Sequence, residues 1–208
     1  MVDDEQQNRL LITGAAVLTL NKSHDIINDG AVAIEGNQII AVGESAEMYE
    51  RFPDMQTMDA KGKAVMPGLI NSHTHAVLLV LRGTVEDMTG DAIFGYMTPI
   101  SFAMTDDERR AIARLGCLEA IRSGTTTLVE PFRFLAGYAQ GMVETGMRLW
   151  LGENCADALT LKIRHGIYEY DRAFGEQFLE RTVSMVEKFH GAKNGRVQCQ
   201  ISAHAPDV

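Results

Sequence analysis

Two histidines separated by one residue, His73 and His75, are the strongest candidates for chemistry in this sequence. They follow the apolar pair Leu69-Ile70, and Pro67-Gly68 before that pair predicts a turn leading into a new strand. Side chains two residues apart on a strand share a face, so a strand over residues 69–75 would bring both imidazoles side by side. Two such imidazoles can ligate one divalent metal ion, although chance placement of polar residues at a strand end gives the same pattern.

A catalytic zinc ion usually has three protein ligands and a water molecule, so two histidines leave the site incomplete. We expect the third ligand to be either His204 or a residue outside this sequence. Zinc lowers the pKa of its bound water towards about 7, which makes that water a nucleophile at neutral pH. Because imidazole also suits Fe, Co and Ni, the pattern predicts one divalent metal ion, with Zn as the first choice.

Strand and helix patterns alternate after the histidines. Apolar segments predict four strands, which begin at Leu69, Thr125, Met147 and Val197. The first long helix between them is predicted to start at a capping box made by Thr105 and Glu108. Its apolar stripe is predicted to consist of Ala111, Leu115, Leu118 and Ile121.

Alternating β and α elements imply a parallel sheet, and therefore an α/β fold. Four β/α units make half of an eight-stranded barrel, which typically takes about 250 residues, more than residues 67–208 supply. We expect this region to be the N-terminal half of such a barrel, with a complete four-unit α/β sheet as the alternative.

Polar residues stand at all four predicted strand ends, where a barrel holds its active site. Besides the two histidines, these residues are Glu130, Glu153 and His204. Each carboxylate could equally be a solvated loop residue. The segment from residue 88 to 99 follows the histidines and is predicted either to close over the pocket or to be a plain surface connection. The remaining histidines are predicted to be surface residues: His24, His165 and His190.

Residues 8–66 read as β structure with little helix. Residues 10–20 predict two short strands or one bulged strand, and Glu35-Gly36-Asn37 predicts a hairpin between two further strands. Residues 46–52 could form one or two helical turns.

The composition excludes several classes of partner. A net charge of −9 argues against nucleic acid or an anionic membrane surface, because both need a basic patch. The three cysteines are widely spaced and suggest a reducing compartment without a disulfide framework. With no long apolar run and no secretory pattern, the predicted location is cytoplasmic.

The segment from Met66 to His75 resembles the first barrel strand of the amidohydrolase superfamily. With Leu81-Arg82-Gly83 and Glu86-Asp87 after it, the closer resemblance is to the group of methylthioadenosine/S-adenosylhomocysteine deaminases and chlorotriazine hydrolases. It covers nearly the whole chain from about residue 10. The resemblance implies a metal-dependent hydrolase, with residues 1–66 as part of a small β-sandwich and residues 67–208 as the first four β/α units of a (β/α)8 TIM barrel.

The resemblance also assigns roles to residues. The segment from Ser202 to Asp207 resembles the family's fourth strand, whose histidine contacts the substrate, so it assigns His204 to substrate binding, with metal ligation as the alternative. The family's other metal ligands and its proton-shuttling glutamate would lie beyond Val208, in a C-terminal remainder of the barrel. Hydrolytic deamination of an N-heterocycle is implied. A dehalogenating or amide-cleaving amidohydrolase and a non-catalytic barrel subunit are the alternatives, and a homo-oligomer is a further expectation from the family.

Two positions depart from the pattern of the nucleoside deaminases. Pro99-Ile100-Ser101 stands where they have Pro-Ile-Glu, whose glutamate binds ribose, and Glu153 stands where they have an arginine. Together with the strand-end residues and the family's fourth-strand histidine, the residues predicted to bind the substrate are Ser101, Glu153, Glu130 and His204. The two changes predict a small-molecule substrate without ribose, and the negative charge of Glu153 is expected to disfavour an anionic substituent.

Overall fold

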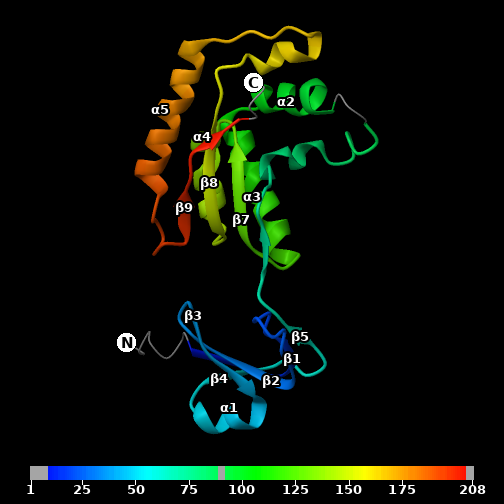
Figure 1. Cartoon of the computed structure of the whole chain (residues 1–208), viewed down its shortest axis with the longest axis vertical. Coiled ribbons are helices and arrows are strands. Elements are labelled where there is room, and N and C mark those ends of the chain that lie inside the picture. The colour runs from blue at the N-terminus through cyan, green and yellow to red at the C-terminus, as the bar shows by residue number, and fades with distance from the viewer. Residues whose placement is uncertain (1–8, 89–91, 205–208) are drawn as a thin grey trace. The chain divides into compact units, whose positions relative to one another are not determined.

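The computed structural model describes residues 9–88 and 92–204 (Figure 1). The chain divides into two compact units, residues 1–67 and residues 68–208. None of the helices within the described ranges is long and apolar enough to cross a lipid bilayer.

The first unit is a single five-stranded sheet with one short helix. Its strands lie in the order β3-β2-β1-β4, and β5 also pairs with β1. The elements are β1 (Arg9–Leu18), β2 (Ile26–Glu35), β3 (Gln38–Glu44), α1 (Ser45–Arg51), β4 (Gln56–Asp59) and β5 (Ala64–Val65). Two packed sheets are not seen in the part of this unit that the structure describes, so the β-sandwich implied by the family resemblance is not confirmed.

A bulge in β1 explains how one strand serves two partners. The register with β2 shifts between Ile12 and Ala15, where Gly14 adopts a φ of 77° that favours glycine. The first half of β1 pairs with β4 and the second half with β5, both in parallel. One bulged strand was one of the two expectations for residues 10–20. Beneath the first half of β1, the Met48 side chain of α1 packs against the buried residue Leu11.

The second unit alternates strands and helices, as the sequence predicted. All its strand pairs are parallel, in the order β10-β8-β7-β6, with β9 also paired to β8. The strands are β6 (Leu69–Asn71), β7 (Thr125–Phe132), β8 (Arg148–Cys155), β9 (Val197–Cys199) and β10 (Ser202–Ala203). The helices are η2 (Ala76–Leu81), η3 (Ile93–Met97), α2 (Thr98–Ala103), α3 (Asp106–Arg122), α4 (Leu135–Val143), η4 (Thr160–His165) and α5 (Arg172–Phe189).

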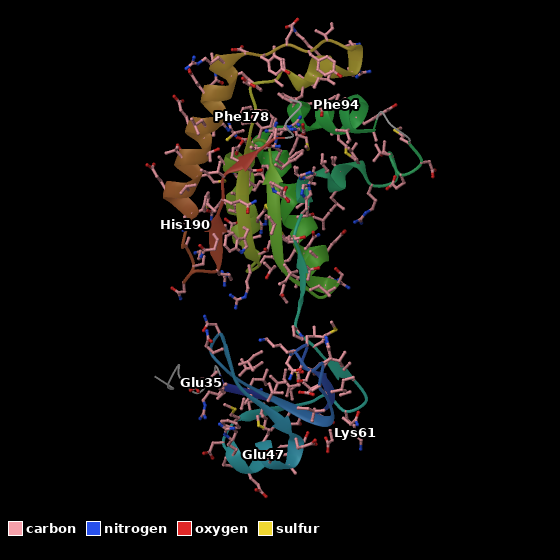
Figure 2. The ribbon with its side chains drawn as sticks, in the orientation of Figure 1. Glu35, Glu47, Lys61, Phe94, Phe178 and His190 are labelled. Carbon is pink, nitrogen blue, oxygen red and sulfur yellow. The ribbon has the colours of Figure 1, made fainter. Side chains whose placement is uncertain are left out.

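The fourth predicted strand is split into β9 and β10. Both pieces pair with β8, and between them the Gln200 N–H still donates to the Leu151 carbonyl at 2.9 Å. The chain therefore stays beside β8 through the break. The core of this unit lies between the strands and helices α3, α4 and α5. Phe178 of α5, labelled in Figure 2, is buried against the ring of Phe134.

Helix α3 begins at the predicted capping box but turns a different face inward. The Thr105 hydroxyl accepts from the Glu108 N–H, and the Glu108 carboxylate accepts from the Thr105 N–H. The predicted stripe is wrong, because α3 buries Ala113 and Cys117 while its larger apolar residues, Leu115, Leu118 and Ile121, are exposed. The inward face must be small, since a Cβ on Gly116 would lie 2.8 Å from the Ala76 carbonyl oxygen.

Candidate metal and substrate site

The two histidines lie just past the end of β6 rather than within a strand. Strand β6 stops at Asn71, whose side-chain oxygen accepts from the His73 N–H at 3.2 Å. The Thr74 N–H then donates to the Val129 carbonyl of β7 at 2.9 Å, which holds the segment beside its neighbour. The two imidazoles therefore lie side by side, as predicted, but in a short loop that these two hydrogen bonds hold in place.

The geometry of the pair suits a shared metal ion. The Nε2 atoms of His73 and His75 are 3.3 Å apart. Two nitrogen ligands at about 2.0–2.1 Å from a tetrahedral zinc ion would be about 3.3–3.4 Å apart, which matches the separation of these two atoms. Within the described residues, no group of three or more His, Cys, Asp or Glu side chains comes together as a ligand set. Metal ligation by His204 stays an alternative prediction.

His75 is held in the neutral form that binds metal ions. Burial lowers its pKa from 6.5 to about 4, and the nearby His73 and Arg133 act in the same direction. Its ring packs against the Phe132 ring, with 4.5 Å between their centroids.

A pocket of about 440 Å³ opens beside the histidines, within the size range of small-molecule sites. Its lining combines apolar walls with a few polar groups and consists of His73, His75, Leu78, Ile93, Met97, Thr98, Pro131, Phe132, Arg133, Asn154, Ser202, Ala203 and His204. Part of the predicted covering segment, from Ile93 to Thr98, is helical and contributes to this wall. Residues 89–91 of that segment lie outside the described residues.

Arg133 is the functional candidate that the sequence reasoning missed. Its side chain leaves the end of β7 and is only 7% exposed, yet it lines the pocket. Its Nη1 donates to the hydroxyls of Ser101 and Thr160, each at 3.4 Å, and its Nη2 lies 3.3 Å from His204 Nε2. The sequence does place a charged residue, Arg133, directly after a predicted strand. No second residue at a characteristic spacing marks it as functional.

His204 lines the same pocket as the histidine pair. Because arginine is always protonated and cannot accept, its contact with Arg133 makes His204 Nε2 the acceptor and assigns the ring proton to Nδ1. The His204 N–H donates to the Cys155 carbonyl of β8 at 3.1 Å, which fixes the backbone here. The role of His204 in substrate binding stays a prediction.

The sequence comparison identifies the protein's relatives. The model of the Amidohydrolase family matches residues 64–207. The chain belongs to the amidohydrolase family. A 5-methylthioadenosine/S-adenosylhomocysteine deaminase of Carboxydothermus hydrogenoformans is 30% identical over 198 residues, which cover 95% of this chain and 42% of the relative. A deaminase of the same description from Syntrophus aciditrophicus is 40% identical over 145 residues, or 69% of this chain and 33% of the relative.

A solved structure shows the same fold. It is an atrazine chlorohydrolase from Arthrobacter aurescens TC1 complexed with zinc, which is 21% identical and matches with a TM-score of 0.73. The match covers 93% of this chain and 46% of the chlorohydrolase. This amidohydrolase chain thus spans less than half the length of the relatives it matches.

Glu130 of this amidohydrolase chain does not line the pocket. Its carboxyl is 0% exposed and accepts from the Ala76 N–H at 2.9 Å and the Tyr138 hydroxyl at 3.1 Å. It thereby ties the residue that follows His75 to helix α4. Burial raises the pKa of Glu130 from 4.5 to about 8, although both hydrogen bonds oppose that shift. Its geometry supports a positioning role behind the histidines rather than substrate contact.

Replacing Glu130 with Gln is expected to flatten the pH dependence of stability. Because the folded-state pKa is raised, the stabilising contribution is fully present below about pH 4.5 and is lost as the pH rises through about 8. Glutamine mimics the protonated acid and does not titrate. Urea denaturation should therefore show a smaller fall in the free energy of unfolding between about pH 5.5 and about pH 8.5 in Glu130→Gln than in the unchanged protein. Equal falls in both proteins would contradict the assignment.

Glu153 is also turned away from the pocket. It is 0% exposed, and its carboxylate accepts from the Phe134 N–H and the Ala136 N–H, both at 2.6 Å, at the start of α4. Arg181 lies 3.5 Å from the same carboxylate. This placement removes the basis for expecting Glu153 to repel an anionic substituent, because its charge is bound to the helix terminus and Arg181.

Ser101 lies behind the pocket wall. Its side chain is 1% exposed, and its hydroxyl donates to the Thr98 carbonyl at 2.6 Å and accepts from Arg133. The structure therefore brings His73, His75 and His204 together around the pocket, with Ser101 one step removed. It does not bring Glu130 or Glu153 into the pocket. The other three histidines, His24, His165 and His190, are exposed as predicted.

Proposed function

We propose that the intact protein is a metal-dependent hydrolase that deaminates an N-heterocyclic substrate. The observation that carries the proposal is the 3.3 Å separation of the Nε2 atoms of His73 and His75 in the wall of a pocket of small-molecule size. These histidines would hold one divalent metal ion, with zinc the first candidate, since the related chlorohydrolase was solved with zinc. When bound, the ion supplies Lewis-acid activation of water.

The chain's own residues would bind and orient the substrate. The apolar side chains of Leu78, Ile93 and Met97 form walls that exclude water from a heterocyclic ring. His204 and Arg133 offer polar contacts at one side of the same pocket. The remaining metal ligands, the general acid and the C-terminal remainder of the barrel would come from sequence additional to this chain, which spans 42% of its deaminase relative.

Ammonia release from a panel of heterocycles tests this function. We expect the intact protein, loaded with zinc, to release ammonia from at least one amino-substituted purine, pterin or triazine. Ser101 is buried and bonded to a carbonyl, so it offers paired ribose hydroxyls no acceptor. A bare ring should therefore exceed adenosine, S-adenosylhomocysteine and methylthioadenosine by about tenfold or more in kcat/KM.

The alternatives give different products in the same assay. The likeness to a chlorohydrolase makes dehalogenation the second candidate, and chloride release without ammonia from chlorotriazines would favour it. Release of neither product from any compound would favour a non-catalytic barrel subunit. A nucleoside that beats every bare ring by tenfold would overturn the expectation drawn from Ser101.

A further inference from the structure

Arg133 carries a buried positive charge that no carboxylate among the described residues pairs with. Within the described residues, no carboxylate lies within ion-pair distance of its guanidinium, whereas the equally buried Arg109 is paired with Asp106 at 2.8 Å. Burying an unpaired charge costs stability unless a partner compensates it. Burial of the Arg133 charge is therefore expected to lower the stability of the fold more than burial of the Arg109 charge, which Asp106 compensates.

The guanidinium contacts hydroxyl groups, an imidazole and aromatic rings. Its three polar contacts, to Ser101, Thr160 and His204, measure 3.3–3.4 Å and are long for hydrogen bonds. The rings of Phe102 and Phe132 lie 5.4 Å and 5.5 Å from its central carbon. A planar fork of donors thus lies in the pocket wall, and the described residues offer it no carboxylate acceptor.

We propose that Arg133 is a specificity-determining residue that binds an anionic substituent, a carboxylate, on the heterocyclic substrate. The proposal rests on the proposed function for the identity of the ring. The carboxylate would accept from the guanidinium fork beside His204 and provide the countercharge that the described protein residues do not. Because this contact is made through a planar fork, lysine would replace it only in part.

Calorimetric titration with two ligands of one shape tests the proposal without turnover. The probes are nicotinate, which carries a carboxylate, and 3-acetylpyridine, its neutral counterpart. The intact, metal-loaded protein should bind nicotinate about tenfold or more tightly than 3-acetylpyridine, the gain expected of a hydrogen bond to a charged group. In Arg133→Met the two affinities should become equal within about twofold, and in Arg133→Lys the ratio should be intermediate.

Arg181→Gln is the matched control. It removes a guanidinium that stacks on Phe134 outside the pocket, so the affinity ratio should not change. Thermal melting establishes whether each variant folds. If Arg133→Met does not fold, the comparison with Arg133→Lys tests the proposal.

Two results would overturn the proposal. A ratio near one in the unchanged protein would mean that Arg133 already has its countercharge within the protein. A ratio that survives in the folded Arg133 variants would mean that the metal ion, or another group, binds the carboxylate. The ammonia assay separates this outcome from failure of the proposed function: ammonia release with an Arg133-independent ratio refutes only the role of Arg133. An Arg133-dependent ratio without ammonia release refutes only the reaction.

Discussion

The double variant His73→Ala/His75→Ala is expected to contain no divalent metal above background and to lose more than about 100-fold of the ammonia-releasing activity. The two imidazoles present their Nε2 atoms 3.3 Å apart, so removing both deletes a matched pair of ligands. Changes to groups that only support a metal ligand already cost about 10–100-fold in affinity or activity, and loss of the ligands themselves should cost more.

Metal analysis of the purified intact protein measures the first part of this prediction directly. The control is His24→Ala/His165→Ala, which removes two exposed histidines and should leave the metal content unchanged. If the His73/His75 variant kept the stoichiometry of the unchanged protein, the metal would have to be bound elsewhere, and the proposed site would be abandoned.

Glu153→Ala is expected to destabilise the protein by about 3 kcal/mol or more. The substitution leaves the Phe134 and Ala136 N–H groups without their acceptor, and each unsatisfied buried group costs about 1–3 kcal/mol. Arg181 also loses its partner. Urea denaturation of the intact protein gives the free energy of unfolding, and Glu153→Gln should show a smaller loss because it keeps one acceptor oxygen.

Glu144 provides the matched control at the other end of the same helix. Its carboxylate is half-exposed and lies 3.5 Å from Arg114, so Glu144→Ala should cost less than about 1 kcal/mol. If Glu153→Ala were as mild as this control while substrate affinity fell, Glu153 would belong to the pocket after all, as the sequence first suggested.

The sequence predicted the elements of this fold better than the directions of their side chains. Strand and helix periods differ, so the β/α alternation and the capping box at Thr105 could be recognised locally. The His-x-His pair was recognisable from its spacing, although the structure brings the two imidazoles together in a loop and not on a strand. The inward face of α3 was not, since it depends on the close approach of Gly116 to Ala76, which no local pattern records.

Glu130 and Glu153 show why strand ends alone were a poor guide to the pocket. Side chains two residues apart share a face, and Leu128 and Leu151 are buried beside the helices. Glu130 and Glu153 follow those leucines by two residues and therefore point the same way. Alternation along the strand could have indicated this. It could not have indicated Arg133, which reaches the pocket from beyond the end of β7 through contacts with Ser101, Thr160 and His204.

This alternation has an evolutionary consequence. Pro131 of β7 and Asn154 of β8 are among the residues that line the pocket, while the neighbouring Glu130 and Glu153 are hydrogen-bonded to backbone N–H groups on the helix side. Substitutions at the first pair can alter which molecules are accepted without breaking the hydrogen bonds of the second pair. We therefore expect selection on adjacent codons to differ: one set would respond to ligand preference and the other to the stability of the fold.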